Sequence, residues 1–229
     1  MKKLLYVPMI HMEADLGSLA PTFNQRCIQI YGEERWEKHK RVVSKFWDCI
    51  ATFFDGLDAS NLKIYQDGLV EDGKLGQKIV EEAAKKGSKN HQIILNLMQK
   101  GANIVKTEDL SLVKKEYDTL MKLAGEKHFL QRTVRYIQYK LLKASLMQKR
   151  DRFIAQRIHK TLKEEELGVL FIGVYHDILS RISKDIKVYE VKEKTKIKAY
   201  FDGLIREKDE KKFDELAEYL ILPVEDLKL

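Results

Sequence analysis

The sequence predicts an α/β fold in which a central, mostly parallel sheet of about five strands is flanked by helices. Three observations predict this class. Short apolar runs of strand length, rich in β-branched and aromatic residues, alternate with segments that have helical spacing. The 229-residue chain contains only 3 Pro and 12 Gly, which argues against a loop-rich β-sandwich. Its hydrophobic share of 44% provides enough apolar surface for a folded core and excludes a disordered chain.

The expected strands fall into two groups. The runs at 3–10 and 168–172 are almost entirely apolar, which is typical of central strands buried on both faces of a parallel sheet. The other three alternate apolar residues with Lys or Asn, as edge or half-covered strands do; they are 61–65, 102–106 and 185–191.

Apolar residues at helical spacing predict the helices between these strands. They are expected at 33–55, at 74–86 and 88–100 with Ser88 as an N-cap, at 109–124, 126–147 and 151–163, and as two helices within 194–221. Residues 109–163 form a helical insert before the fourth strand. Because there is no internal repeat and no linker, residues 1–229 are expected to form one α/β domain with C-terminal helices.

The positive charge is concentrated in one segment. The chain has 42 Lys and Arg against 35 Asp and Glu, a net charge of +7, whereas residues 122–163 alone hold 12 basic and 2 acidic residues, or +10. Tyr136 and Tyr139 stand among these basic residues, so the segment could bind nucleic acid by phosphate contacts and base stacking. The alternative is a solvated helix face.

The cysteine count and the apolar runs indicate the compartment. Cys27 and Cys49 are too few for a disulfide framework and are interpreted as structural, although one bridge between them is left open. No apolar run approaches the roughly 20 residues that span a bilayer. Polar residues from His11 onward interrupt the apolar start of the chain before a signal peptide could form. A soluble cytoplasmic protein with no membrane partner is expected.

Polar side chains follow four of the predicted strands. They are His11, Glu13 and Asp15 after the first, Gln66 and Asp67 after the second, Glu108 and Asp109 after the third, and His176 and Asp177 after the fourth. Ligands of an open parallel sheet bind at the carboxyl ends of its strands, so these side chains should converge. Imidazole and carboxylate suit Mn, Co, Zn or Fe, or the activation of water by a general base.

Each of these residues also has a structural interpretation. Asp109 and Asp177 suit helix caps, and Asp67-Gly68 is a turn signal. The remaining histidines lie on helical patterns amid charged residues and are expected at the surface; they are His39, His91, His128 and His159. The sequence contains no dinucleotide fingerprint, phosphate-binding loop or Gly-x-Ser-x-Gly elbow.

Two segments resemble the TraB/Tiki/erythromycin-esterase/ChaN-like superfamily. They are Arg150-Asp151-Arg152-Phe153-Ile154-Ala155 and the strand that ends in Gly173-Val174-Tyr175-His176. The superfamily has an arginine at a helix start followed by a strand that ends in Gly-x-x-His. Its earlier Gly-x-x-His aligns with Pro8-Met9-Ile10-His11, and its acidic residue after the second strand aligns with Gln66-Asp67. The resemblance implies a hydrolase-like site, because some relatives look like metal-dependent proteases or esterases and others bind iron or haem.

The leading hypothesis is a hydrolase of ester or peptide type, with or without a divalent metal. His11, His176 and Arg150 would be catalytic, and His11, His176, Asp67 and Glu13 would hold the metal. Arg150, Glu108 and Tyr175 would contact an anionic small molecule or peptide. The first alternative is a non-catalytic protein that binds a small anion or a metal in the same crevice, and the second is nucleic-acid binding through 122–163. A shared site requires His11 and His176 to lie within about 10 Å of each other, with Arg150 entering from a helix start.

Overall fold

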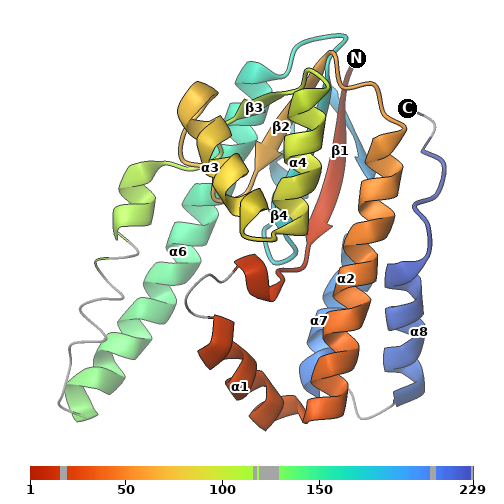
Figure 1. The fold of residues 1–229 in the computed structure, drawn as a ribbon. Helices are drawn as coiled ribbons and strands as arrows, with labels where there is room; N and C mark the ends of the chain where they lie inside the picture. Colours follow the sequence, from red (N-terminus) through yellow and green to blue (C-terminus); the bar gives the residue numbers. More distant parts are fainter. Residues whose placement is uncertain (16–19, 116–117, 119–128, 207–209, 228) are drawn as a thin grey trace.

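Five parallel strands form one sheet in the computed structural model of this chain, which confirms the predicted α/β class (Figure 1). The strand order is β3-β2-β4-β1-β5. The strands are β1 (Lys2–Met9), β2 (Leu62–Gln66), β3 (Asn103–Val105), β4 (Leu167–Gly173) and β5 (Ile186–Glu190). The structure describes residues 1–15, 20–115, 118, 129–206, 210–227 and 229, and for 129–142 and 205–206 the backbone alone.

The helices largely follow the predicted ranges. They are α1 (Ala20–Tyr31), α2 (Glu33–Asp55), α3 (Gly73–Lys85), α4 (Lys89–Gln99), α6 (Phe129–Thr161), α7 (Lys194–Arg206) and α8 (Glu210–Ile221), with a short 3₁₀ turn η2 (Leu179–Arg181). Ser88 caps α4 as predicted, because its side chain accepts a hydrogen bond from the backbone N–H of His91. Helix α1 was not predicted.

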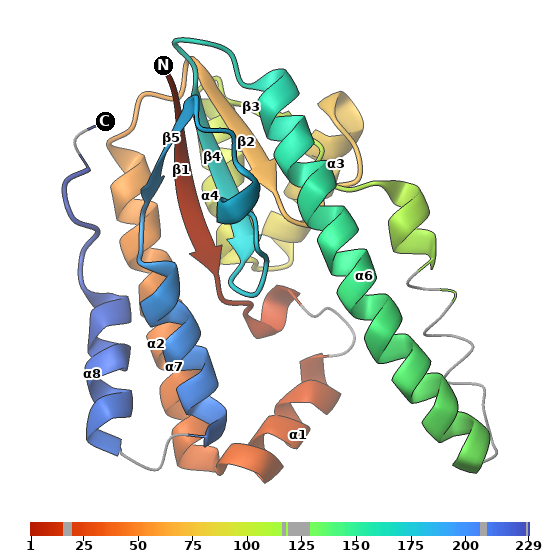
Figure 2. The ribbon, with the colours of Figure 1, turned by 180° about the vertical axis from the view of Figure 1, so that it is seen from behind.

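The sheet separates two hydrophobic cores. Alternate residues of a strand point to opposite faces, so Leu5 and Val7 of β1 join the core beneath α2 and α4, while Leu4 and Tyr6 join the core beneath α6. Figures 1 and 2 show α3 and α4 on one face and α6 on the other. Strands β1 and β4 lie side by side in the middle and are buried, as their apolar sequences predict.

Helix α6 corrects one prediction of the sequence. Separate helices at 126–147 and 151–163 were expected, with Arg150 at the start of the second; instead one helix runs from Phe129 to Thr161 and carries Arg150 in its interior. No Gly or Pro lies between 147 and 151, so nothing in the chain breaks the helix there. Asp151, the first residue of the predicted second helix, uses its carboxylate for contacts outside α6.

Helices α2 and α7 extend beyond the carboxyl edge of the sheet and are joined there by α1 (Figure 1). Helix α1 packs against both α2 and α7, and α8 packs against the outer side of the pair. These helices build walls above the strand ends, where ligands of parallel sheets bind. Among the helices of the described ranges, none is both long and apolar enough to cross a membrane.

The packing of α6 on the sheet can be tested by Ile158→Ala. Ile158 is fully buried in the core beneath α6, so its truncation should lower the free energy of unfolding by about 2–5 kcal/mol. The matched control is Ile30→Ala on α1, because Ile30 is 57% exposed and its truncation should change stability by less than about 0.5 kcal/mol. Urea denaturation measures both, and equal effects would contradict this packing.

Candidate functional site

Five ionisable side chains meet at the carboxyl ends of β2 and β4. Asp67 follows β2, Glu108 follows β3, His176 follows β4, and Arg150 and Asp151 come from α6. All are largely buried; Glu108, Asp151 and His176 are 1%, 2% and 5% exposed. We call this group the ion cluster.

His176 lies between two carboxylates of the ion cluster. Its Nδ1 is 2.5 Å from Oδ1 of Asp151, and its Nε2 is 3.3 Å from Oδ2 of Asp67. The other oxygen of Asp151 accepts the backbone N–H of Asp177 at 2.9 Å, and the Lys194 ammonium donates to the carbonyl of His176 at 2.6 Å. These contacts fix both the position and the orientation of the imidazole ring.

Arg150 links the remaining carboxylates. Its Nε is 3.0 Å from both oxygens of Glu108, and its Nη2 is 3.1 Å from Oδ1 of Asp67. Oδ2 of Asp67 also accepts the backbone N–H of Gly173 at 3.2 Å. Asp67 is therefore bonded to an arginine, to a histidine and to the end of β4, while the adjacent Gly68 makes the turn with a φ of 84° that the sequence predicts.

Contacts within the ion cluster shift the pKa values of its side chains. Burial disfavours the charged imidazole, but the hydrogen bonds to Asp151 and Asp67 outweigh it and raise the pKa of His176 to about 9. Burial likewise opposes the charge on Asp67, yet His176 and Arg150 lower the pKa of this carboxyl to about 2. Burial raises the pKa of Glu108, and Arg150 counteracts it. His176 is thus an imidazolium at neutral pH.

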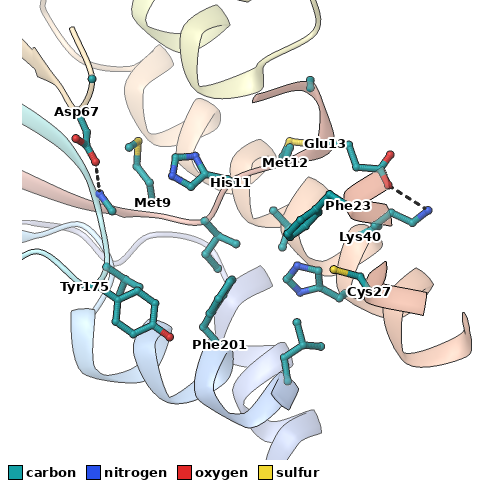
Figure 3. Close-up of a pocket in the computed structure, with 18 of the residues that line it drawn as sticks. Met9, His11, Met12, Glu13, Phe23, Cys27, Lys40, Asp67, Tyr175 and Phe201 are labelled. Carbon is teal, nitrogen blue, oxygen red and sulfur yellow. Dashed lines mark hydrogen bonds and ion pairs between the residues drawn. The ribbon is translucent and has the colours of Figure 1, made fainter. Parts of the chain in front are cut away.

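His11 and Glu13 lie outside the ion cluster. His11 is largely exposed; its Nδ1 is 3.8 Å from Oδ2 of Asp15, and this carboxylate raises the pKa of His11. Asp15 is held in turn by the Ser88 hydroxyl at 2.5 Å, so the chain after β1 is tied to the start of α4. Glu13 pairs with Lys40 of α2 at 3.8 Å, further along the wall (Figure 3).

The ion cluster borders a pocket of about 850 Å³. Asp67, Arg150, His176, Gly173 and His11 stand at one end of it. The rest is mainly apolar and comes from the chain after β1, from α1, α2 and α7, and from Met147 of α6; these residues include Met9, Met12, Phe23, Cys27, Trp36, His39 and Phe201. Figure 3 shows Asp67 and Tyr175 on one side of the pocket and Phe23 and Cys27 on the other. The crevice predicted at the carboxyl ends of the strands is therefore a pocket whose sides are formed by α1, α2 and α7.

The structure brings some of the predicted site residues together and not others. His176, Asp67, Arg150, His11 and Glu13 line one pocket, whereas Glu108 contacts Arg150 and is not among the lining residues. Tyr175 also lines the pocket, is 51% exposed and donates its hydroxyl to Asp202 at 2.9 Å. Cys27 and Cys49 are both free thiols.

Two residues of the site were missed by sequence reasoning. Asp151 was read as a helix start, although it stands directly beside Arg150 in the run that resembles the superfamily. His39 was expected at the surface and is 4% exposed, so that prediction was wrong. His159 is exposed and His91 half-buried, and His128 lies outside the described residues.

The basic segment 122–163 is described only in part. Residues 122–128 lie outside the described residues, as do the side chains of 129–142, among them Tyr136 and Tyr139. Of the remainder, Lys143 lines the pocket, and Arg152 and Lys160 border a shallow hollow of about 530 Å³ together with Arg181. Nucleic-acid binding through this segment stays a prediction.

The predicted ligands of a divalent metal contact other side chains in this structure, and the metal site stays a prediction. Both ring nitrogens of His176 face carboxylates, Asp151 at Nδ1 and Asp67 at Nε2. Glu13 is engaged with Lys40. Within the ranges that the structure describes, no three His, Cys, Asp or Glu residues are grouped so that they could hold a metal ion.

Comparison of the chain with protein-family models, with curated proteins and with solved structures finds no match. The resemblance to the TraB/Tiki/erythromycin-esterase/ChaN-like superfamily therefore stays a prediction.

The charge of His176 can be tested by Asp151→Asn. Removing the carboxylate at Nδ1 should lower the pKa of His176 from about 9 toward its ordinary value of 6.5. The pH titration of the imidazole signals by NMR measures this pKa. Asp185→Asn is the control, because Asp185 is exposed and pairs with Lys2. A titration midpoint of His176 that stays the same in Asp151→Asn would contradict the pairing.

The same pKa predicts how stability depends on pH. A pKa of about 9 lies above the ordinary value of 6.5, so the imidazolium stabilises the native state fully below pH 6.5 and loses this contribution as the pH rises through about 9. The difference in free energy of unfolding between the wild type and His176→Asn should therefore shrink between these pH values. Urea denaturation across this range measures it, with the exposed His159→Asn as control. A difference that grows with pH would contradict the sign.

Proposed function

We propose that this chain is a hydrolase acting on a small substrate in the pocket, with the Asp151–His176 pair as its proton-transferring unit. The observation that supports this most directly is the buried Asp151 carboxylate on Nδ1 of a histidine that lines the pocket and whose other nitrogen faces Asp67. A buried carboxylate that orients a histidine is a recurring arrangement in hydrolytic sites. The support for this proposal comes from the arrangement of the side chains in the structure.

The protonation state of His176 favours a general acid. Its Nε2–H faces Asp67 in the resting protein, and a substrate oxygen placed there would accept the same hydrogen. In the proposed reaction, water adds to the acyl carbon, the bond to the leaving group breaks, and the Nε2 proton passes to the leaving oxygen. The proton that the water releases returns to Nε2, so the ring regains its charge and the reaction balances.

Asp67 and Arg150 define the surroundings of the reacting group. With its pKa near 2, Asp67 is a weak base, so it serves to hold the imidazolium and to align the attacking water. Arg150 lines the pocket and supplies the positive charge nearest to a developing oxyanion. The charged groups of the ion cluster are paired with one another, Arg150 with Glu108 and Asp67 and His176 with Asp67 and Asp151, so the proposed substrate is neutral.

A non-catalytic binding protein is the second candidate. The observation that favours it is the mutual pairing of His176, Asp67 and Arg150, which leaves the polar end of the pocket satisfied without a substrate. Saturable binding of a small molecule without turnover would distinguish this function from hydrolysis.

Hydrolysis can be tested on a panel of neutral aryl and alkyl esters and capped peptides. His176→Asn should lower kcat/KM by about 10²–10⁴-fold, because it removes the positioned acid. For the wild type, kcat/KM should fall as the pH rises through about 9, since the imidazolium loses its proton there.

The control for this experiment is His159→Asn, which changes an exposed histidine of α6 outside the pocket and should retain full activity. Wild-type protein without turnover of any panel member would contradict the hydrolase proposal. An activity that rises through pH 9 would contradict the acid role of His176.

A further inference from the structure

The end of the pocket away from Asp67 is formed by aromatic side chains around a buried histidine. We call it the aromatic end; its residues are Phe23 and Tyr31 of α1, Trp36 and His39 of α2, and Phe201 of α7. In Figure 3, Phe23 and Phe201 stand on either side of this end. The proposed reaction uses none of these residues.

The His39 ring is fixed by stacking. Its centroid is 4.9 Å from that of Trp36 with an angle of 24° between the planes, and 5.8 Å from that of Tyr200 with an angle of 17°. Phe201 meets the same ring edge-on at 6.3 Å. A ring held on three sides keeps one orientation, which is a requirement for a specific polar contact in an apolar pocket.

The hydrogen bonding of His39 indicates which ring nitrogen carries the hydrogen. Nδ1 is 3.0 Å from the hydroxyl of Tyr200, which is fully buried. A buried hydroxyl hydrogen needs an acceptor, and within the described residues Nδ1 is the partner that the structure gives it. The hydroxyl therefore donates to Nδ1, and the ring hydrogen is on Nε2. Burial lowers the pKa of His39 to about 4, so the ring is neutral.

Aromatic surface continues from His39 to the ion cluster. Phe201 contacts both His39 and Tyr175, and the Tyr175–Phe201 centroid distance is 6.0 Å. Tyr175 precedes His176 and is 51% exposed, and Phe23 is 44% exposed. Two large, poorly covered rings in the wall of a pocket indicate a surface that a ligand covers.

We propose that the aromatic end selects neutral aryl carbonyl compounds: a flat aromatic body packs against Phe23, Trp36 and Phe201 while His39 Nε2–H donates to a carbonyl oxygen. The volume of about 850 Å³ suits such a ligand, since drug-sized molecules occupy sites of roughly 300–1,000 Å³. The inference rests on the proposed function only in placing a separate, scissile ester group of the substrate at His176; the binding of the aryl carbonyl group at His39 does not depend on catalysis.

The probe for the experiment is prodan, a neutral naphthyl ketone whose fluorescence reports transfer into an apolar site. Titration of the full chain with prodan should show one saturable site. Phe23→Ser should weaken binding by roughly three- to tenfold through lost aromatic contact. His39→Leu should weaken it by a similar factor through loss of the hydrogen bond. Phe23 is an exposed position, so this variant tests the proposal even if His39→Leu fails to fold by circular dichroism.

Two controls separate the binding from the reaction. Tyr189→Ser changes a half-buried aromatic residue of β5 outside the pocket lining and should leave prodan affinity unchanged. His176→Asn should lower kcat/KM for ester hydrolysis by about 10²–10⁴-fold while prodan affinity stays within about twofold. If prodan binds as expected but no ester is hydrolysed, the proposed hydrolase function is contradicted, whereas the proposal that the aromatic end binds aryl carbonyl compounds is supported. Absence of saturable binding, or equal weakening by Phe23→Ser and Tyr189→Ser, would overturn the inference.

Discussion

The charged His176 side chain, held between Asp151 and Asp67, is the interaction on which the rest of the site depends. It joins the interior of α6 and the end of β4 to the end of β2, which lies far from both in the sequence. Buried charges are costly unless they are paired, and removal of one partner from a buried pair costs about 3–5 kcal/mol. The pairing therefore constrains the neighbours: Asp67 needs Arg150 as well as His176, and Arg150 in turn needs Glu108.

The strand ends could be predicted from the sequence because apolar runs and the polar residues that follow them are local features. His11 and His176 line one pocket because β1 and β4 pair directly, with Met9 opposite Gly173. Strand order itself was not predictable, since β1 pairs with residues 164 positions away in β4 and 184 positions away in β5, and no local pattern specifies which strands are neighbours. The partner of His176 was missed for a similar reason: an aspartate after Arg150 suits a helix cap locally, and only the path of β4 brings His176 to it.

The burial of His39 could have been predicted from its helical spacing, but the charged residues beside it suggested an exposed position. Charged residues surround it at 37, 38, 40 and 41, and this composition suggested an exposed position. Its spacing to Trp36 and Val43 is three and four residues, however, which places it on the apolar stripe of α2. Periodicity was the better guide here, because the side to which a helical residue points is set by its position along the turn and not by the charges beside it.

The two ends of the pocket are compatible because the charged groups satisfy one another. Asp67, Arg150 and His176 find their partners within the protein, so apolar walls from α1, α2 and α7 can approach them without stranding an unpaired charge. Electrostatic interactions are stronger among buried groups than in water, and the members of the ion cluster are largely buried. The carboxylates of Asp151 and Asp67 therefore hold the proton on His176 at neutral pH. A neutral, largely apolar molecule enters such a pocket at lower desolvation cost than an anion does, so the charge network and the aromatic wall favour the same class of ligand.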